Sequence, residues 1–399
     1  MKKHVVIGLS GGVDSSVAAY LLKEQGYRVS ALFMRNWHDT TGLLQSECHW
    51  EDDYMFAEMV ARKLDIPFHF VDLSEPYRQR VIDYMFSEYQ KGRTPNPDVL
   101  CNREIKFDSF AEEARRLGGD FVATGHYCRR DIHEADGKIW YRLLAGKDKN
   151  KDQSYFLCQL NQDQLAFALF PIGHLTKPDI RRIAADLGLP TAQRKDSQGI
   201  CFVGKVDLPT FLQQKLEPCE GDVIEIPAIG TGSEPIAGLP DYSADESVLS
   251  ELCRTPSFKP ADGKKAGRHK GAHFYTIGQR KGLNIGGYRE PLFILATDTV
   301  SNTIYVGEGH SHPALNRKGL FIGNDHIHFI RPDLRMSAGE VRDYMVRIRY
   351  RQPLQEARLF CRQNGIYIIF NELQRGITPG QFAAWYDGEE LIGSGVISG

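Results

Sequence analysis

The segment from His4 to Ser15, HVVIGLSGGVDS, constrains the fold of this chain more than any other stretch. Its apolar residues 5–7 are typical of a buried strand in a parallel sheet. Gly11 and Gly12 let the following turn approach a ligand closely, because glycine has no Cβ. Asp14 begins a helix, whose free N–H groups and dipole attract anions. The segment therefore predicts a strand, a turn and a helix that together bind a phosphate.

Two common phosphate loops do not fit this turn. The kinase-type loop needs a lysine after its last glycine, and none follows these glycines. The dinucleotide fingerprint G-x-G-x-x-G is also absent. The remaining pattern, S-G-G-x-D-S, resembles the pyrophosphate loop of the ATP pyrophosphatases. That resemblance implies cleavage of ATP to AMP and pyrophosphate while a carbonyl oxygen is adenylated. A tight turn without a ligand is the alternative, and six specified positions in this context favour the loop.

The composition narrows the class of protein. A chain of 399 residues with 42% hydrophobic and 25% charged residues is expected to form two or three globular domains. Its net charge of −2 gives no global argument for nucleic acid, so such an argument must come from local patches. We find no signal peptide or membrane-spanning run and expect a cytoplasmic location with reduced thiols. None of the eight cysteines forms a C-x-x-C pair, so no metal site is expected.

Strands and helices alternate through the first part of the chain. We expect strands at 28–34, 66–73 and 120–124, and helices at 52–64, 75–90, 106–117 and 179–187. This alternation predicts an α/β fold with a doubly wound parallel sheet. In such sheets, ligands bind beyond the carboxyl ends of the strands, where the glycine loop, Met34 and residues 125–127 lie. Met34 is a candidate adenine contact or plain core.

Two cysteines lie on predicted turns. The segment 94–103, TPNPDVLCNR, is predicted to be a loop because of its prolines and asparagines, and it places Asp98 three residues before Cys101. The alternative is an Asx turn with an incidental cysteine. Cys201 follows a glycine in DSQGICFV, where inert packing is the alternative to a reactive thiol.

The second half of the chain differs from the first in composition and in predicted secondary structure. Residues 217–267 are rich in proline and glycine, and from residue 291 short strands dominate, with hairpin turns at 364–365 and 387–388. These strands predict a closed antiparallel barrel. In residues 346–351 three arginines alternate with apolar residues, which predicts a phosphate-binding stripe or an exposed barrel face.

Seven motifs occur in one order along the chain: GLSGGVDS, NPDVLCN, ATGHY, KDQSYFL, DSQGICF, YTIGQRKGL and RYRQ. In this order they resemble the bacterial tRNA-specific 2-thiouridylases over nearly the whole length. The resemblance implies a sulfurtransferase that adenylates the C2 oxygen of the wobble uridine with ATP and Mg²⁺. A cysteine persulfide then supplies sulfur to form 2-thiouridine, with release of AMP and pyrophosphate. The implied partners are lysine, glutamate and glutamine tRNAs and a sulfur donor, either a cysteine desulfurase or a relay protein.

The resemblance also implies a division into three parts. Residues 1–204 would form the catalytic domain, with the adenine nucleotide alpha-hydrolase-like fold. Residues 205–288 would form a small central domain that helps to bind tRNA, and residues 289–399 the β-barrel. The stretch near 217–267 looks like an insertion that the resemblance does not cover.

The resemblance assigns the site residues as well. Cys201 would carry the persulfide, Cys101 would be its partner thiol in a transient disulfide, and Asp98 would be an acid or base. The residues that would bind ATP are Gly8, Leu9, Ser10, Gly11, Gly12, Val13, Asp14, Ser15, Met34 and Gly125. The residues that would contact tRNA are Asn96, Pro97 and Asp98 at the target base, with His126, Lys151, Asp152, Gln153, Arg349, Tyr350 and Gln381 elsewhere.

Two rival functions share part of this pattern. Another enzyme with the same loop, such as an amidating ligase or a different tRNA sulfurtransferase, would not need both the NPDVLC and GIC segments. A non-catalytic tRNA-binding protein would tolerate the loss of Asp14 or Cys201.

Overall fold

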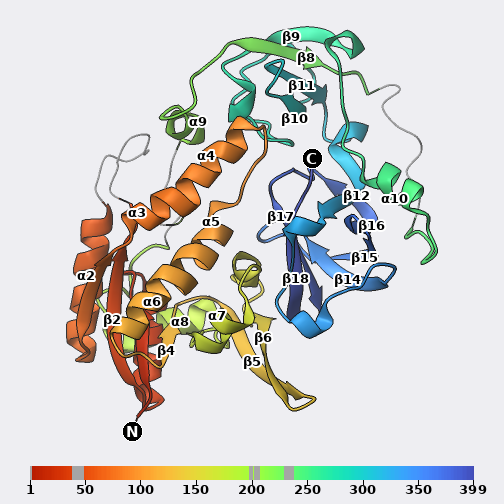
Figure 1. Cartoon of the computed structure of the whole chain (residues 1–399). Coiled ribbons are helices and arrows are strands. Elements are labelled where there is room, and N and C mark those ends of the chain that lie inside the picture. Colours follow the sequence, from red (N-terminus) through yellow and green to blue (C-terminus); the bar gives the residue numbers. More distant parts are fainter. Residues whose placement is uncertain (1, 38–48, 197–200, 202–206, 229–237) are drawn as a thin grey trace.

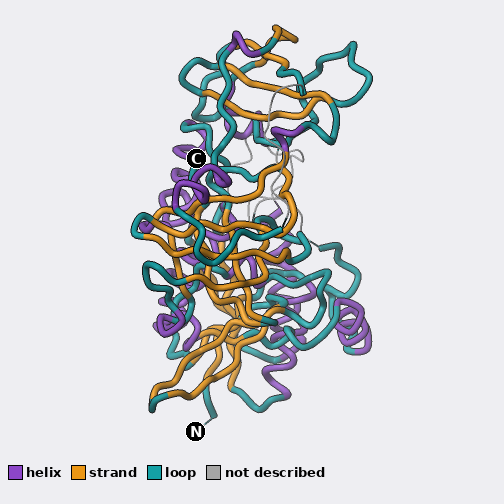
Figure 2. Tube along the Cα trace, turned by 90° about the vertical axis from the view of Figure 1, so that its right-hand side faces the viewer, coloured by secondary structure: helices purple, strands orange, loops and turns teal. Residues whose placement is uncertain are grey.

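The computed structural model describes residues 2–37, 49–196, 201, 207–228 and 238–399. Figure 1 shows an α/β part that begins at the N-terminus, a small sheet at the opposite end of the molecule, and a C-terminal sheet between them. Figure 2 shows the small sheet set apart at one end of an elongated molecule. No helix within the described residues is both long enough and apolar enough to cross a membrane.

The N-terminal part contains a five-stranded parallel sheet in the order β3-β2-β1-β4-β7. Its strands are β1 His4–Gly8, β2 Arg28–Arg35, β3 Phe68–Asp72, β4 Phe121–Ala123 and β7 Ala168–Leu169. From β1 the chain moves through β2 to β3 and then returns to the other side of β1 with β4. Such a reversal opens a crevice at the carboxyl ends of the two strands that flank it, here β1 and β4.

Helices cover both faces of this sheet, which confirms the doubly wound prediction. Val6 of β1 packs with helical residues such as Tyr77 and Phe110 on one face. Val5 and Ile7 point the other way and pack with residues of α1, α2 and α8. The helical segments are α1 Val13–Glu24, α2 His49–Leu64, α3 Ser74–Tyr77, the π-helix η1 Arg78–Ile82, α4 Asp83–Gln90, α5 Pro97–Leu100, the π-helix η2 Cys101–Ser109, α6 Phe110–Arg116, the 3₁₀-helix η3 Ser154–Leu157, α7 Gln162–Phe167 and α8 Lys177–Asp186.

The loop predicted at 94–103 is only half a loop. From Pro97 the backbone is helical and continues without a break through η2 and α6 to Arg116. Asn96 is the N-cap, whose side chain accepts a hydrogen bond from Val99 N at 3.3 Å. Pro97 occupies the first helical turn, where its missing N–H costs nothing. The residues that indicated a loop are therefore the start of a helix.

A hairpin in the first half of the sequence belongs to the C-terminal sheet. Strands β5 Cys128–Ala135 and β6 Lys138–Ala145 pair with each other, and β6 pairs with the last strand, β18 Glu390–Val396. In Figure 1 this hairpin extends from the α/β part beneath the C-terminal sheet. The two parts of the chain are therefore joined through backbone hydrogen bonds.

The central sheet differs from the predicted domain division. Its order is β10-β11-β8-β9, with β8 Gly221–Glu225, β9 Lys264–His269, β10 Leu292–Asp298 and β11 Thr303–Glu308. Strand β8 and most of β9 lie inside the stretch predicted to be an insertion, yet β8 is an inner strand of the sheet. Strands β10 and β11 were expected in the barrel, but β11 pairs with β8. The central unit therefore extends to about residue 308 rather than ending at 288.

The chain between β8 and β9 reaches across to the C-terminal sheet. Within it, α10 Glu246–Cys253 packs Leu249 and Cys253 against β12 and β16. Arg358 of the C-terminal sheet donates a 2.7 Å hydrogen bond to the carbonyl of Pro240 and stacks over the Tyr242 ring. This segment fastens the central unit to the C-terminal part.

The C-terminal part is an antiparallel sheet of nine strands, two of which are β5 and β6. The other strands are β12 Asn316–Gly323, β13 Ile327–Phe329, β14 Val341–Arg347, β15 Gln355–Arg362, β16 Gly365–Arg375, β17 Phe382–Asp387 and β18. The hairpin turns at 364–365 and 387–388 are confirmed by the pairing of β15 with β16 and of β17 with β18. Ser398 N donates to the Phe321 carbonyl at 2.9 Å, so the end of the chain closes back onto β12.

The predicted stripe of three arginines is wrong. Strand β14 ends at Arg347, and Arg349 and Arg351 lie in the turn that follows. Arg347 is buried, with its Nη1 atom 3.2 Å from Oδ2 of the buried Asp152. Its guanidinium also lies over the Tyr386 ring. The alternating pattern predicts that Arg347 faces solvent, whereas in the structure its side chain is buried.

Candidate functional site

The glycine loop joins β1 to α1 at the crevice between β1 and β4. Gly11 has a φ of +72°, and a Cβ there would lie 2.3 Å from the Asp53 carbonyl oxygen. Gly125, just beyond β4, packs so closely that a Cβ would lie 2.8 Å from Ser15 N. Gly12 caps α1 without a side-chain hydrogen bond, which leaves the first N–H groups of the helix for a ligand. The predicted segments at the ends of β1, β2 and β4 therefore meet, with Met34 largely buried near the end of β2.

Charged side chains surround this loop. Lys177 Nζ lies 2.7 Å from Asp14 Oδ1 and 2.7 Å from Asp196 Oδ1. Lys151 and Arg181 also contact Asp196, at 2.6 Å and 2.9 Å. Although burial opposes it, hydrogen bonds from the two lysines lower the pKa of Asp196 to about 2. Three cations thus gather where phosphates would lie, and of these only Lys151 was predicted to be a site residue.

Arg194 adds a further cation to the loop. It donates a 2.9 Å hydrogen bond to the Gly11 carbonyl and lies 2.9 Å from Asp53 Oδ1. No local sequence pattern indicates Lys177 or Arg194, because both lie more than 160 residues from the loop in the sequence. For magnesium, Asp14 is the acidic residue on the loop, and the described residues contain no cluster of three potential metal ligands.

The two predicted cysteines lie together. The Cys101 thiol donates a hydrogen bond to the Cys201 sulfur, and both are free thiols. Cys101 is completely buried, whereas Cys201 is partly exposed. Cys201 N donates to Asp98 Oδ1 at 2.9 Å, and Tyr77 Oη donates to the Cys201 carbonyl at 2.7 Å. Helices α3 and α5 therefore hold the backbone on which Cys201 is carried.

The electrostatics of the two thiols differ. The hydrogen bond from Cys101 and the charge of Lys106 lower the pKa of Cys201 to about 7, against the effect of burial. Burial and the neighbouring sulfur raise the pKa of Cys101 well above its usual value. Burial likewise raises the pKa of Asp98, which favours its protonated form. Cys201 is consequently the better nucleophile and Asp98 a potential proton donor.

Two of the residues predicted to contact tRNA are buried. His126 Nδ1 and Thr124 Oγ1 share a hydrogen bond of 2.7 Å. Burial lowers the pKa of His126 well below the usual value. Asp152 accepts from Gly146 N at 3.0 Å and Ser154 N at 3.1 Å, besides pairing with Arg347. In this conformation both side chains support the fold.

The other predicted contacts lie where the α/β part meets the C-terminal part. Gln381 Nε2 donates to the carbonyls of Thr94 and Pro95 at 3.0 and 3.2 Å, and Asn96 Nδ2 donates to Gln381 Oε1 at 3.4 Å. The Tyr350 ring lies 4.4 Å from that of Phe156. The start of α5 is therefore held by the C-terminal part.

Gln153 and Arg349 make backbone contacts of their own. Gln153 Oε1 accepts a 3.0 Å hydrogen bond from Tyr127 N, which ties the 151–153 segment to the residue after His126. Arg349 donates to the carbonyl of Arg375.

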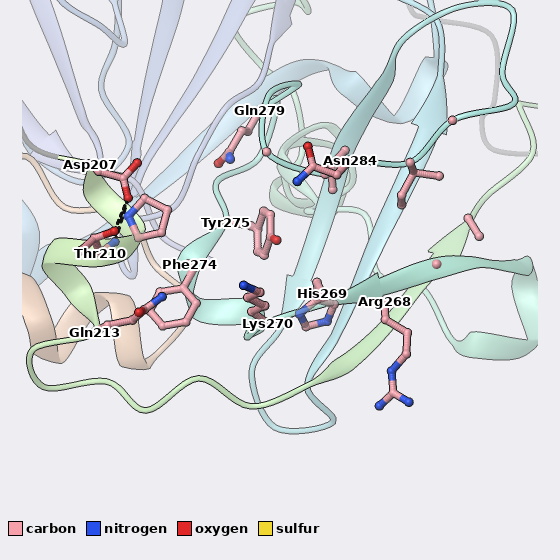
Figure 3. A pocket seen from close by; sticks show the side chains of 17 residues that line it. Asp207, Thr210, Gln213, Arg268, His269, Lys270, Phe274, Tyr275, Gln279 and Asn284 are labelled. Carbon is pink, nitrogen blue, oxygen red and sulfur yellow. Dashed lines mark hydrogen bonds between the residues drawn. The ribbon is translucent and has the colours of Figure 1, made fainter. Parts of the chain in front are cut away.

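A separate cavity of about 610 Å³ lies in the central unit. It is bounded by the short helix α9 Leu208–Leu212, by β9 and by the loop 279–286. Figure 3 shows Arg268 and His269 of β9 and the following Lys270 on one side, and Gln279 and Asn284 of the loop on the other. Arg268 lies 3.2 Å from Glu220, so part of its charge is compensated.

Comparison with known proteins gives full-length relatives. Residues 3–205, 255–308 and 321–397 match family models described as the tRNA methyl transferase HUP domain, the tRNA methyl transferase PRC-barrel domain and the aminomethyltransferase beta-barrel domain. A protein of Flavobacterium johnsoniae named tRNA-specific 2-thiouridylase MnmA is 57% identical over 399 residues, covering 99% of this chain and 100% of its own. Proteins of the same name from Christiangramia forsetii and Karelsulcia muelleri are 57% and 43% identical and cover 99% and 100% of this chain, and 100% and 99% of their own. Since these relatives match from end to end, the chain belongs to the family of tRNA-specific 2-thiouridylases.

Proposed function

We propose that this protein converts the wobble uridine of tRNA to 2-thiouridine, with ATP as the activating substrate and a persulfide on Cys201 as the sulfur carrier. The observation that carries the proposal is the thiol pair: Cys201, with a pKa of about 7, receives a hydrogen bond from the buried Cys101. The full-length relatives named as tRNA-specific 2-thiouridylases give the substrate class.

ATP would bind at the glycine loop. The N–H groups at the start of α1 would hold the pyrophosphate, and Gly8–Ser15, Met34 and Gly125 would line the nucleotide. Lys177 would exchange its ion pair with Asp14 for one with the phosphates, because the phosphates carry more negative charge. Mg²⁺ would be held by the phosphates with Asp14 as the protein ligand, and it would neutralise the departing pyrophosphate.

The uridine would lie against Asn96, Pro97 and Asp98 at the start of α5. Its C2 oxygen attacks the α-phosphorus of ATP, the N3 proton passes to the Asp98 carboxylate, and pyrophosphate leaves. Asp98, whose pKa is raised by burial, is suited to exchange protons with the base. The C2 oxygen is then part of a phosphate ester. It can leave C2 as AMP, whereas the unmodified carbonyl oxygen is a poor leaving group.

The sulfur steps use both thiols. The terminal sulfur of the Cys201 persulfide attacks C2, and the C–O bond breaks to release AMP. Cys101 then gives up its thiol proton, which passes to N3, and attacks the Cys201 sulfur, so that the S–S bond to the transferred sulfur breaks. Its electrons form the thiocarbonyl as N3 regains a proton, which leaves a Cys101–Cys201 disulfide. A cellular dithiol must reduce this disulfide before the next turnover.

The remaining assignments follow from the same reaction. Arg349, Tyr350 and Gln381, with His126 and residues 151–153, would support tRNA where the α/β and C-terminal parts meet. Lysine, glutamate and glutamine tRNAs are the expected acceptors, and a cysteine desulfurase or a relay protein the expected donor. The seven described cysteines are all free thiols, which suits the reducing cytoplasm.

The activation step can be tested without sulfur. Purified protein is incubated with ATP, Mg²⁺ and a tRNA transcript carrying U34 or C34, and the release of pyrophosphate is measured. We expect pyrophosphate with U34 only, and its loss in Asp14→Asn. Asp136→Asn is the matched control, since Asp136 lies at an exposed hairpin turn with a φ of +51° that asparagine tolerates. Equal pyrophosphate release with U34 and C34, or none with either, would overturn the proposal.

A further inference from the structure

Lys106 lies beside the thiol pair and has no role in the function described above. It hydrogen-bonds to the Cys201 side chain and interacts electrostatically with Cys101 and Asp98. It lies within η2 and is only partly exposed. An ammonium this close to two thiols and a carboxyl group acts on whichever of them is ionised.

The π-helix explains how Lys106 reaches this position. In η2 each turn closes from residue i to residue i+5, as shown by the bond from Phe110 N to the Ile105 carbonyl. The same spacing of five separates Cys101 from Lys106, so both reach the same site. In an α-helix this spacing would rotate the lysine by about 140° away from the cysteine.

The other titratable groups at the site do not supply a positive charge. Burial lowers the pKa of His126 and raises that of Tyr77, so both are neutral near pH 7. Burial also raises the pKa of Asp98. Lys106 keeps its proton, because the two sulfurs outweigh the effect of its own burial and raise its pKa. Of the groups named at this site, Lys106 alone is a cation.

We propose that Lys106 is the positioning residue of the sulfur chemistry: its ammonium holds the Cys201 sulfur as an anion for loading and delivery. In loading, the Cys201 thiolate attacks the terminal sulfur of a donor persulfide, RS–SH. The new S–S bond gives Cys201–S–SH, and the donor leaves as RS⁻ with the electrons of the broken bond. Lys106 stays protonated throughout and exchanges no atom. This inference rests on the proposed function for its biological meaning, but its electrostatic content does not depend on tRNA or ATP.

The test measures the ionisation of Cys201 alone. Folded protein is alkylated with iodoacetamide between pH 5 and 10, and mass spectrometry of the Cys201 peptide gives the rate at each pH. We compare wild type with Lys106→Met, Lys106→Arg and the control Lys138→Met, which removes an exposed lysine from the β5–β6 hairpin. In wild type about half of Cys201 is ionised at pH 7. We expect Lys106→Met to slow alkylation at pH 7 by about 5- to 10-fold with recovery at pH 9, Lys106→Arg to restore most of the rate, and Lys138→Met to match wild type.

The outcomes separate this inference from the proposed function. If Lys106→Met keeps the wild-type pH profile, or loses rate equally at pH 7 and pH 9, the positioning role is wrong. If it does not fold, Lys106→Gln, which keeps a donor but not the charge, replaces it in the same comparison. A protein that shows the Lys106 effect but makes no 2-thiouridine overturns the proposed function and leaves this inference standing. A protein that makes 2-thiouridine but shows no effect of Lys106 on Cys201 alkylation overturns this inference alone.

Discussion

The close approach of Gly125 to the glycine loop gives a sharp prediction about ATP binding. In Gly125→Ala, the new Cβ would lie 2.8 Å from Ser15 N, 3.0 Å from the Asp14 carbonyl carbon and 3.1 Å from Ser15 Cα. All three are backbone atoms, so no side-chain rotation relieves the clash. Reaching an ordinary contact of 3.4 Å moves the start of α1 by about 0.6 Å.

This displacement should weaken nucleotide binding more than stability. The free protein can relieve the clash by moving the loop outward, but a bound pyrophosphate needs the N–H groups at their present positions. Overpacking of this kind costs about 1–3 kcal/mol. If the cost falls on the bound state, the Kd for ATP rises by about 5- to 150-fold.

Isothermal titration calorimetry with ATP measures this change, and thermal unfolding reports stability. Gly286→Ala is the matched control, because a Cβ there meets no atom within 4 Å and its backbone conformation accepts alanine. The control should bind ATP as wild type does. If Gly125→Ala binds ATP within twofold of wild type at an unchanged Tm, the loop does not bind nucleotide in the arrangement described.

Three further predictions concern the ion pairs and the thiols. Replacing Arg347 with Met strands the buried Asp152 carboxylate, so the free energy of unfolding in urea should fall by about 3–5 kcal/mol; a fall below 1 kcal/mol would contradict the buried pair. Asp196 has a pKa of about 2 in the folded protein, below its ordinary value, so it stabilises the protein above pH 4 and loses this effect as the pH falls toward 2. The difference in Tm between wild type and Asp196→Asn should therefore shrink between pH 4 and pH 2. A constant difference would refute this prediction. Cys101→Ala removes the hydrogen bond that lowers the pKa of Cys201, so alkylation of Cys201 at pH 7 should slow by about tenfold, and an unchanged rate would show that the thiols do not interact.

The strand, turn and helix of the glycine loop could be predicted from sequence because their determinants are local. A strand, two glycines and a helix start lie within twelve consecutive residues, and each follows from rules about neighbouring positions. Lys177 and Arg194 could not be predicted, because they reach the loop through tertiary packing. The β5–β6 hairpin was missed for the same reason: its partner strand, β18, lies about 250 residues later.

The thiol site shows a different limit of sequence reasoning. Cys101, Cys201 and Asp98 were expected from the family resemblance, and the structure brings them together. Lys106 was missed because standard helical spacing separates positions five residues apart, whereas a π-helix brings them to one site. Asn96 and Pro97 were interpreted as loop residues, although an asparagine N-cap followed by proline is also a typical helix start.

The wrong predictions for Arg347 of β14 and for the central sheet have a common cause. A period-two pattern shows which residues share a face but not which face is buried, so Arg347 was placed outward. Proline and glycine suggested an insertion at 217–267, yet two short strands within it complete the central sheet. In both cases the deciding partner is distant in sequence.

The central claim is that sulfur reaches the uridine through Cys201. The most direct test is thiolation of a U34 tRNA transcript with ATP, Mg²⁺ and a persulfide donor, comparing wild type with Cys201→Ser and Cys101→Ser by nucleoside mass spectrometry. We predict 2-thiouridine from wild type, and none from Cys201→Ser although it still adenylates the RNA and releases pyrophosphate. Cys101→Ser should retain the sulfur on the enzyme as an adduct with the RNA. Normal 2-thiouridine formation by Cys201→Ser would contradict the account, because the activated base would then take its sulfur from another carrier.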